Sequence, residues 1–168
     1  MDAVKTLILG GARSGKSLIA ERLASRSAEP VTYVATVRLG NDENLAQRVA
    51  AHRERRPPAW STIQCGDDLA DILASTIGTV LVDSLGPWIA ALPTMQCDLE
   101  LLVGALRARS GDTIIVSEEV GLGVHPETSI GREFRDALGT LNQAIAQECD
   151  DVLFVVAGRA LSLPRSDW

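Results

Sequence analysis

The sequence predicts an α/β fold with a mostly parallel central sheet, in a single domain that takes up residues 1–168. Short β-rich segments alternate with amphipathic stretches of helical periodicity along the chain. The β-rich segments are almost continuous in apolar residues, as expected of parallel strands that helices cover on both faces. A length of 168 residues suits one core of this kind and is too short for two.

The first strand and the loop after it form the most informative stretch. Val4 to Leu9 is predicted to be a buried strand, which runs into Gly10-Gly11-Ala12-Arg13-Ser14-Gly15-Lys16-Ser17. This spacing matches a phosphate-binding loop, in which glycines let successive N–H groups point at phosphate oxygens. The following helix adds the partial positive charge of its N-terminus. Lys16 is therefore predicted to contact the β and γ phosphates and Ser17 to bind Mg²⁺; the alternative is a plain glycine-rich turn.

The remaining elements are predicted in chain order. The first helix follows the loop and ends near Ser25 to Ser27, and Val31–Ala35 is the second strand. A helix capped by Asn41 or Asp42 ends before Pro57. The other predicted segments are a short strand at 61–64, a short helix at 67–73, a buried strand at 79–83, a loop or helix around Trp88, a helix at 99–109, a strand at 112–117, a helix at 131–149 and a last strand at 151–158, followed by a loose tail from Leu163.

Composition narrows the functional classes. A net charge of −6 argues against a general nucleic-acid binder. No apolar run is long enough for a membrane span, and the first apolar run leads straight into the loop, unlike a signal peptide. The three cysteines, Cys65, Cys97 and Cys149, are far apart and lack metal-ligand spacing. Reduced structural thiols in a cytoplasmic protein are expected.

Several candidate groups follow strands, where ligands of open α/β sheets bind. Besides the loop they are Thr36, Asp83, Glu118 and Glu119. Asp83 ends a hydrophobic strand, the position of the acid that holds Mg²⁺ in phosphate-loop enzymes, and a strand-end cap is the alternative. One of the two glutamates is a candidate base or metal-shell carboxylate. A solvated pair in a loop explains both equally well.

His52 lies beside Arg53, Arg55 and Arg56. Imidazole is a competent nucleophile toward phosphorus, and the arginines favour bound phosphate. From the residues alone, however, a basic helix end is the simpler interpretation. The other histidine, His125, is interpreted as a polar loop residue, and Trp60 and Trp88 as packing residues.

Several stretches together resemble the bifunctional adenosylcobinamide kinase / adenosylcobinamide-phosphate guanylyltransferases of cobalamin biosynthesis. They occur in the family's order and cover nearly the whole chain, which makes the resemblance far more specific than the loop alone. The matching stretches are Gly10–Ser17, Tyr33–Thr36, Arg48–His52, Arg56-Pro57 with Trp60, Val80–Asp83, Glu119–Gly123, Gly131–Asp136, Gly139 with Asn142-Gln143, and Val155–Gly158.

The resemblance implies a three-layer phosphate-loop NTPase fold and two reactions. In the first, ATP or GTP phosphorylates the aminopropanol hydroxyl of adenosylcobinamide. In the second, GMP passes from GTP to that phosphate, which releases pyrophosphate and gives adenosylcobinamide-GDP. The implied cofactor is Mg²⁺, and the implied partners are adenosylcobinamide, its phosphate, GTP and ATP, with no nucleic acid and no membrane span. Because members can be homotrimers, a homo-oligomer is expected, with a trimer as one form.

The resemblance also implies roles for single residues. It makes His52 the carrier of a covalent GMP, which reverses the simpler interpretation above, and Lys16 the other catalytic residue. Ser17 and Asp83 are the implied metal ligands. The implied nucleotide-binding residues are Gly10, Gly11, Ala12, Arg13, Ser14, Gly15, Lys16, Ser17, Ala35, Thr36, Val37, Arg53, Glu54, Arg55, Arg56, Gln64 and Asp83.

The chain departs from the family pattern at some of these stretches. Gln64 stands where the family often has Glu, Asp83 is Glu in some relatives, and Glu118 replaces a common Asn. The segment from Ser84 to Pro87 replaces a more usual Cys-Leu-Thr-Leu type of sequence. These departures concern the substrate site more than the nucleotide chemistry.

Two other functional hypotheses fit the phosphate-binding loop. One is a simple kinase of another small molecule, with His52 only a surface residue. The other is a nucleotide-sensing protein without catalytic activity. His52 with its arginines discriminates between them, because only the bifunctional enzyme needs a nucleophile.

Overall fold

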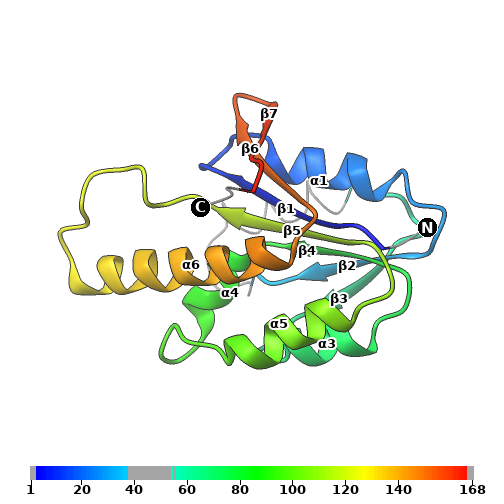
Figure 1. Cartoon of the computed structure of the whole chain (residues 1–168), viewed down its shortest axis with the longest axis horizontal. Helices are drawn as coiled ribbons and strands as arrows, with labels where there is room; N and C mark the ends of the chain where they lie inside the picture. Colours follow the sequence, from blue (N-terminus) through cyan, green and yellow to red (C-terminus); the bar gives the residue numbers. More distant parts are fainter. Residues whose placement is uncertain (1–2, 38–53, 55, 166–168) are drawn as a thin grey trace.

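A seven-stranded sheet runs through the part of the chain that the structure describes (Figure 1). The structure, a computed structural model, describes residues 3–37, 54 and 56–165. Its strands are β1 (Lys5–Gly10), β2 (Val31–Ala35), β3 (Ser61–Gln64), β4 (Thr79–Asp83), β5 (Thr113–Glu118), β6 (Asp151–Val156) and β7 (Arg159–Ser162). Their order is β3-β2-β4-β5-β1-β6-β7, and only the β6–β7 pair is antiparallel. The predicted mostly parallel sheet is confirmed.

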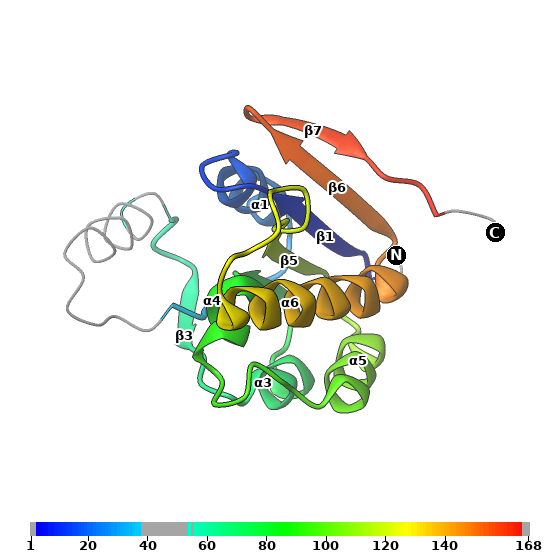
Figure 2. The ribbon, with the colours of Figure 1, turned by 90° about the vertical axis from the view of Figure 1, so that its left-hand side faces the viewer.

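Helices cover both faces of this sheet and give the molecule three layers (Figure 2). The described helices are α1 (Lys16–Ala24), α3 (Leu69–Ser75), α4 (Leu85–Ala91), α5 (Leu99–Ala108) and α6 (Ser129–Glu148). One face carries α1, and the opposite face carries α3 to α6.

Successive strand residues pack against opposite layers, which explains the unbroken apolar runs in the sequence. Leu7 belongs to the larger hydrophobic cluster, on the side of α3 to α6, whereas Ile8 belongs to the cluster on the side of α1. Leu81 likewise packs toward α1, between Val80 and Val82, which pack toward the other helices. Every residue in the middle of these strands is therefore buried on one side or the other.

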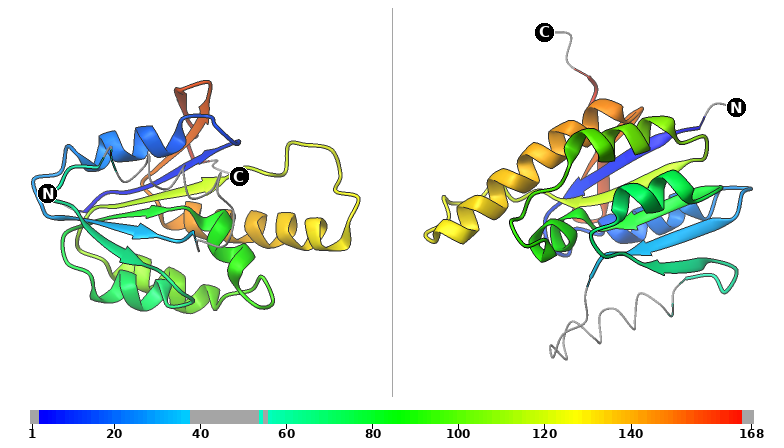
Figure 3. Two further views of the ribbon diagram at one scale, coloured as in Figure 1. Left: turned by 180° about the vertical axis from the view of Figure 1, so that it is seen from behind. Right: turned by 90° about the horizontal axis from the view of Figure 1, so that it is seen from below.

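The strand order brings the candidate groups together at the carboxyl ends of the parallel strands, which we call the functional edge of the sheet. β5 lies between β1 and β4, and its last residue, Glu118, is in register with Gly10 at the end of β1. Asp83, at the end of β4, is in register with Val116 of β5. The connection over residues 119–128 runs out beyond this edge and returns into α6, whose first turns also extend past the strands (Figure 3).

The sheet differs from the prediction at its last strand. The expected last strand, 151–158, ends at Val156, and β7 follows it as an antiparallel neighbour. Ala157 (φ 51°) and Gly158 (φ 74°) form the tight turn between them, with the paired positive φ values of a two-residue hairpin. The prediction was wrong because Ala-Gly is a weak turn signal and every residue of β7 is exposed, so no apolar alternation marks the strand.

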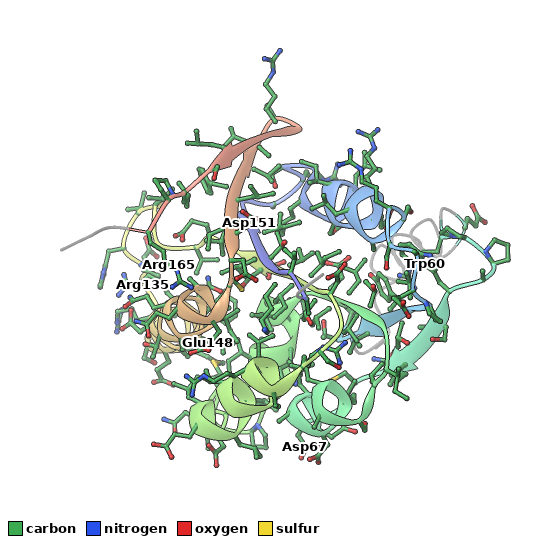
Figure 4. The ribbon with its side chains drawn as sticks, turned by 45° about the vertical axis from the view of Figure 1, so that its right-hand side comes forward. Trp60, Asp67, Arg135, Glu148, Asp151 and Arg165 are labelled. Carbon is green, nitrogen blue, oxygen red and sulfur yellow. The ribbon has the colours of Figure 1, made fainter. Side chains whose placement is uncertain are left out.

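The expected loose tail is also tied to the fold over its described part. The backbone N–H of Leu163 donates to the carbonyl of Val152 at 2.8 Å. The guanidinium of Arg165 donates to the carbonyls of Gln147 and Cys149, both at 3.0 Å, which fixes it at the C-terminal end of α6 (Figure 4). These bonds satisfy carbonyls that a helix end otherwise leaves without donors.

The other predicted elements agree with the described ones apart from their ends. The short helix predicted at 67–73 is α3 at Leu69–Ser75, and the loop or helix around Trp88 is the helix α4. The helix predicted from Asn41 or Asp42 to Pro57 falls almost wholly outside the described residues. None of the helices in the described ranges is long and apolar enough to cross a membrane.

None of the three cysteines takes part in a disulfide within the part of the chain that the structure describes. Cys65 and Cys149 are buried, and Cys97 is half-buried. Burial raises the pKa of the Cys149 thiol to about 12 and also raises the pKa of Cys97. Both thiols therefore stay protonated near neutral pH and behave as packing groups.

Arg109 is a buried cation that fixes the strands of the functional edge at their opposite end. Its guanidinium donates to the carbonyls of Leu73 and Thr76 at 2.8 Å and to the carbonyl of Gly78 at 2.6 Å. Its Nε donates to the hydroxyl of Thr113 at 2.7 Å. One side chain thus connects the turn before β4 to the start of β5.

Arg109→Met should lower the free energy of unfolding by about 3 kcal/mol, because buried carbonyls lose a charged donor. Arg107→Met is the matched control, since Arg107 is exposed and pairs with Glu148 at 2.6 Å on the surface. Its effect should be far smaller, as for other surface ion pairs. Urea denaturation measures both variants, and equal losses would contradict the structural role of Arg109.

Candidate nucleotide-binding site

The phosphate-binding loop, Gly10–Ser17, curls tightly between β1 and α1. Gly15 has φ 98°, a left-handed conformation that favours glycine. A Cβ at Gly10 would lie 2.6 Å from both the Ser14 hydroxyl and the carbonyl of Val155. The loop is anchored by the N–H of Gly158, which donates to the carbonyl of Ser14 at 2.7 Å. The buried Ser14 hydroxyl has no hydrogen-bond partner among the described residues.

Lys16 lies inside this curl as a buried cation, with 8% of the residue exposed. Its Nζ donates to the carbonyl of Gly11 at 3.2 Å and lies 3.5 Å from the carboxylate of Glu118. A buried ammonium group needs such oxygens around it. A phosphate that enters the loop offers Lys16 further anionic oxygens, as the sequence predicts.

Ser17 and Asp83 meet across the edge of the sheet. The Ser17 hydroxyl donates to Asp83 Oδ1 at 3.2 Å, and the Tyr33 hydroxyl donates to Asp83 Oδ2 at 2.8 Å. Burial, and next the negative charge of Asp83, raise the pKa of Tyr33 far above its ordinary value. The Tyr33 hydroxyl therefore stays protonated and keeps its donor role.

The oxygens of Ser17 and Asp83 form a suitable pair for Mg²⁺, which prefers hard oxygen ligands. Within the described ranges, no group of three or more His, Cys, Asp or Glu side chains could hold a metal ion. A magnesium ion at Ser17 and Asp83 would thus depend on phosphate and water oxygens for its other ligands. That arrangement is usual for Mg²⁺ bound with a nucleotide.

Arg56 joins the same cluster from the segment before β3. Its guanidinium carbon lies 3.2 Å from the centre of the Tyr33 ring. Its Nε is buried and has no hydrogen-bond partner among the described residues. The stack places a planar cation next to the tyrosine that holds Asp83, and guanidinium groups bind phosphate in a bidentate manner.

Thr36 and Gln64, two predicted nucleotide contacts, use their polar groups within the protein. The Thr36 hydroxyl accepts from the N–H of Ser84 at 2.8 Å and donates to the carbonyl of Ser84 at 2.7 Å. The Gln64 side chain donates to the carbonyls of Ala35 (2.9 Å) and Val37 (3.1 Å). Both side chains hold the backbone at the ends of β2 and β4, and their contact with a nucleotide stays a prediction.

The other candidate residues belong to the segments of the two histidines. His52, Arg53 and Arg55 are outside the described residues, and Glu54 is exposed. The exposed His125 has its Nδ1 3.0 Å from the guanidinium of Arg135, which agrees with its interpretation as a polar loop residue.

Trp60 and Trp88 are packing residues, as the sequence predicts. Trp88 is buried on the side of α3 to α6, and its ring N–H donates to the carbonyl of Gly66 at 2.9 Å. Trp60 is partly buried and packs against the cluster under α1.

The structure decides between the two glutamates that the sequence left open. The carboxylate of Glu118 turns toward Lys16 and accepts from the Ser84 hydroxyl at 2.8 Å. The carboxylate of Glu119 instead turns back to its own loop and accepts from the N–H of Gly121 at 2.5 Å. No sequence signal separates the adjacent acids, because only the position of α4 and the loop lysine distinguishes their surroundings.

Comparison with known proteins gives this site its context. The family model described as cobinamide kinase / cobinamide phosphate guanyltransferase matches residues 6–163. A Pseudomonas aeruginosa protein named bifunctional adenosylcobalamin biosynthesis protein CobP is 42% identical over 171 residues, which cover 95% of this chain and 97% of that protein. A Salmonella typhimurium protein named bifunctional adenosylcobalamin biosynthesis protein CobU is 32% identical over 174 residues, which cover 90% and 95%.

Solved structures share the architecture at low sequence identity. The flagellar accessory protein FlaH from Methanocaldococcus jannaschii gives a TM-score of 0.58 at 18% identity, over 96% of this chain and 78% of that chain. An ATPase from the type III secretion system of pathogenic bacteria gives 0.52 at 11% identity, over 96% and 57%. At these identities the likeness concerns the fold alone, and it confirms the phosphate-loop NTPase fold.

Lys16→Ala should reduce triphosphate turnover by about 100-fold or more, because the loop loses its charge at the β and γ phosphates. Steady-state kinetics with ATP and GTP measure the effect. The control is Lys5→Ala, a change of the only other lysine, at the opposite end of β1. Unchanged turnover in a folded Lys16→Ala protein would refute the assignment of the loop.

Asp83→Asn should raise the Mg²⁺ concentration needed for half-maximal turnover by about tenfold, since a charged oxygen next to Ser17 becomes neutral. A magnesium titration at fixed triphosphate concentration shows the shift. Asp67→Asn, at an exposed position before α3, serves as the control. If both variants follow the wild-type curve, Asp83 only caps its strand.

Proposed function

The chain belongs to the cobinamide kinase / cobinamide phosphate guanyltransferase family, and on that premise we propose that it catalyses both reactions of a bifunctional enzyme of adenosylcobalamin biosynthesis. It phosphorylates adenosylcobinamide with ATP or GTP and then transfers GMP from GTP to the product. The observation that carries the proposal is the convergence of Lys16, Ser17 and Asp83 at one edge of the sheet, in a chain whose residues 6–163 match the family model.

The kinase step uses the phosphate-binding loop. The loop amides and Lys16 bind the phosphate chain and stabilise the charge that develops on the γ-phosphoryl group. Ser17 and Asp83 hold Mg²⁺, which neutralises phosphate charge when it is bound. The acceptor hydroxyl attacks the γ-phosphorus directly, so this step needs no nucleophile from the protein.

The second step passes GMP through His52. Neutral imidazole attacks the α-phosphorus, pyrophosphate leaves, and the acceptor phosphate then takes GMP from the imidazole. A free histidine has a pKa of about 6.5, so a neutral fraction exists near pH 7. Arg53, Arg55 and Arg56 supply charge for the phosphate oxygens.

Arg56 supports the placement of this second step at the loop. It stacks on Tyr33, whose hydroxyl donates to Asp83, so it belongs to the cluster beside Ser17. His52 precedes Arg56 by four residues, a length of chain that reaches at most about 14 Å. This short separation in sequence supports the proposed role of His52 at the same nucleotide.

We extend the proposal to the remaining features that the resemblance implies. The enzyme is proposed to be a single domain of residues 1–168, cytoplasmic and homo-oligomeric, with a trimer as the expected form. Its nucleotide-binding residues are the loop, Ala35 to Val37, Arg53 to Arg56, Gln64 and Asp83.

His52→Ala should abolish the covalent GMP adduct and GMP transfer but retain kinase activity, because only the second step needs the imidazole. GTP labelled at the α-phosphate measures the adduct. Because histidine and GMP are joined by a phosphoramidate bond, the label should be lost in acid and retained in base. His125→Ala is the matched control and should label like the wild type.

Two results would contradict this proposal. A wild-type protein that phosphorylates adenosylcobinamide but never acquires the label is a kinase alone. A His52→Ala protein that still acquires the label has its nucleophile elsewhere.

A further inference from the structure

Glu118 places a carboxylate at the centre of the functional edge. β5, which it ends, lies between the strand that leads into the phosphate-binding loop and the strand that ends in Asp83. Its Oε1 lies 3.5 Å from Lys16 Nζ and accepts from the Ser84 hydroxyl at 2.8 Å. Its Oε2 accepts from the N–H of Gly86 at 2.9 Å. The carboxylate therefore bridges the loop and the first turn of α4.

Neighbouring elements hold this side chain in one orientation. Gly86 allows the close approach, because a Cβ there would collide with Oε2. From the other side, the Asn142 amide of α6 donates to the backbone carbonyl of Glu118 at 3.1 Å. The Asn142 carbonyl oxygen in turn accepts from the Ser117 hydroxyl at 2.6 Å. The orientation is built into the fold and is not that of a solvated surface acid.

The position of the carboxylate suits a particular chemical task. Lys16 is the residue that contacts the β and γ phosphates, so a group beside its Nζ lies next to the transferred phosphoryl group. An ionised carboxylate only repels phosphate oxygens, but it accepts a proton from a hydroxyl. The side chain is about one-quarter exposed (24%), so an acceptor substrate can reach it.

We propose that Glu118 is the general base of the kinase step, an inference that rests on the proposed kinase activity. The acceptor oxygen forms a bond to the γ-phosphorus, and the bond from the γ-phosphorus to the bridging oxygen breaks. The electron pair of that bond leaves on the nucleoside diphosphate. The hydroxyl proton passes to the Glu118 carboxylate and from there to water.

The second reaction provides an internal comparison. Its acceptor is a phosphate monoester, which is already ionised near neutral pH and needs no base. A base on Glu118 therefore serves phosphorylation and not GMP transfer. A purely structural role, as the anchor of Lys16 or α4, would affect both reactions, since both use the same loop.

The test is Glu118→Gln, which keeps the size of the side chain and removes its basicity. With adenosylcobinamide and ATP, kcat should fall by about 100-fold, the low end for general-base catalysis. With GTP and separately supplied adenosylcobinamide phosphate, GMP transfer should stay within about twofold of wild type, as should the triphosphate Kd. Ser84→Ala, which removes one hydroxyl that orients the carboxylate, should cause a smaller loss of the same selective kind. Glu119→Gln is the matched control and should leave both activities unchanged.

Other outcomes overturn the proposal. If Glu118→Gln lowers both activities equally, or weakens triphosphate binding, Glu118 is a structural anchor. If phosphorylation is unaffected, the proton leaves by another route. A wild-type protein without kinase activity would remove the proposed function itself, and with it this role, a result distinct from those of the variants.

Discussion

A buried ammonium group is the constraint on which the functional edge depends. Lys16 sits inside the loop with little access to water, and a cation in that position is tolerated only among oxygens. The structure supplies the carbonyl of Gly11 and the carboxylate of Glu118. The left-handed turn at Gly15 and the close approach at Gly10 let the backbone wrap around the charge. The loop thus retains a cation for phosphate oxygens to bind.

The second acid of the edge is organised in the same manner. Asp83 accepts from Ser17 on one side and from Tyr33 on the other, and Tyr33 also carries the guanidinium of Arg56. A carboxylate that accepts from two hydroxyls is fixed in direction. Tyr33 thus contacts Arg56 over its ring and Asp83 at its hydroxyl, and this hydroxyl stays neutral.

In our proposals, these two clusters let one edge of the sheet serve two reactions. Both reactions need the phosphate chain held by the loop, and they differ in the attacking group and in the phosphorus attacked. Glu118 stands on the side of Lys16, and Arg56 on the side of Tyr33. In our proposals the former serves the hydroxyl that attacks the γ-phosphorus. The latter belongs to the segment of the histidine that attacks the α-phosphorus.

The parallel α/β fold, the phosphate-binding loop and the acid at the end of β4 could be predicted from the amino-acid sequence. Each is encoded by contiguous residues: apolar runs for strands, and glycines with lysine and serine for the loop. The antiparallel strand β7 escaped prediction because its residues are all exposed and carry no apolar pattern. Its pairing depends on β6 and on a turn with two positive φ values.

The side chains that face the site could not be predicted in this way, because their directions depend on contacts between distant parts of the chain. Glu118 and Glu119 are equivalent in sequence, yet one faces Lys16 and the other its own loop. That difference depends on the order of β4, β5 and β1 and on a glycine of α4 that lies 32 positions away from Glu118. Thr36, a predicted nucleotide contact, proved to hold the backbone of Ser84. Local patterns specify backbone conformation, whereas the direction of a side chain depends on partners that only the folded chain brings near.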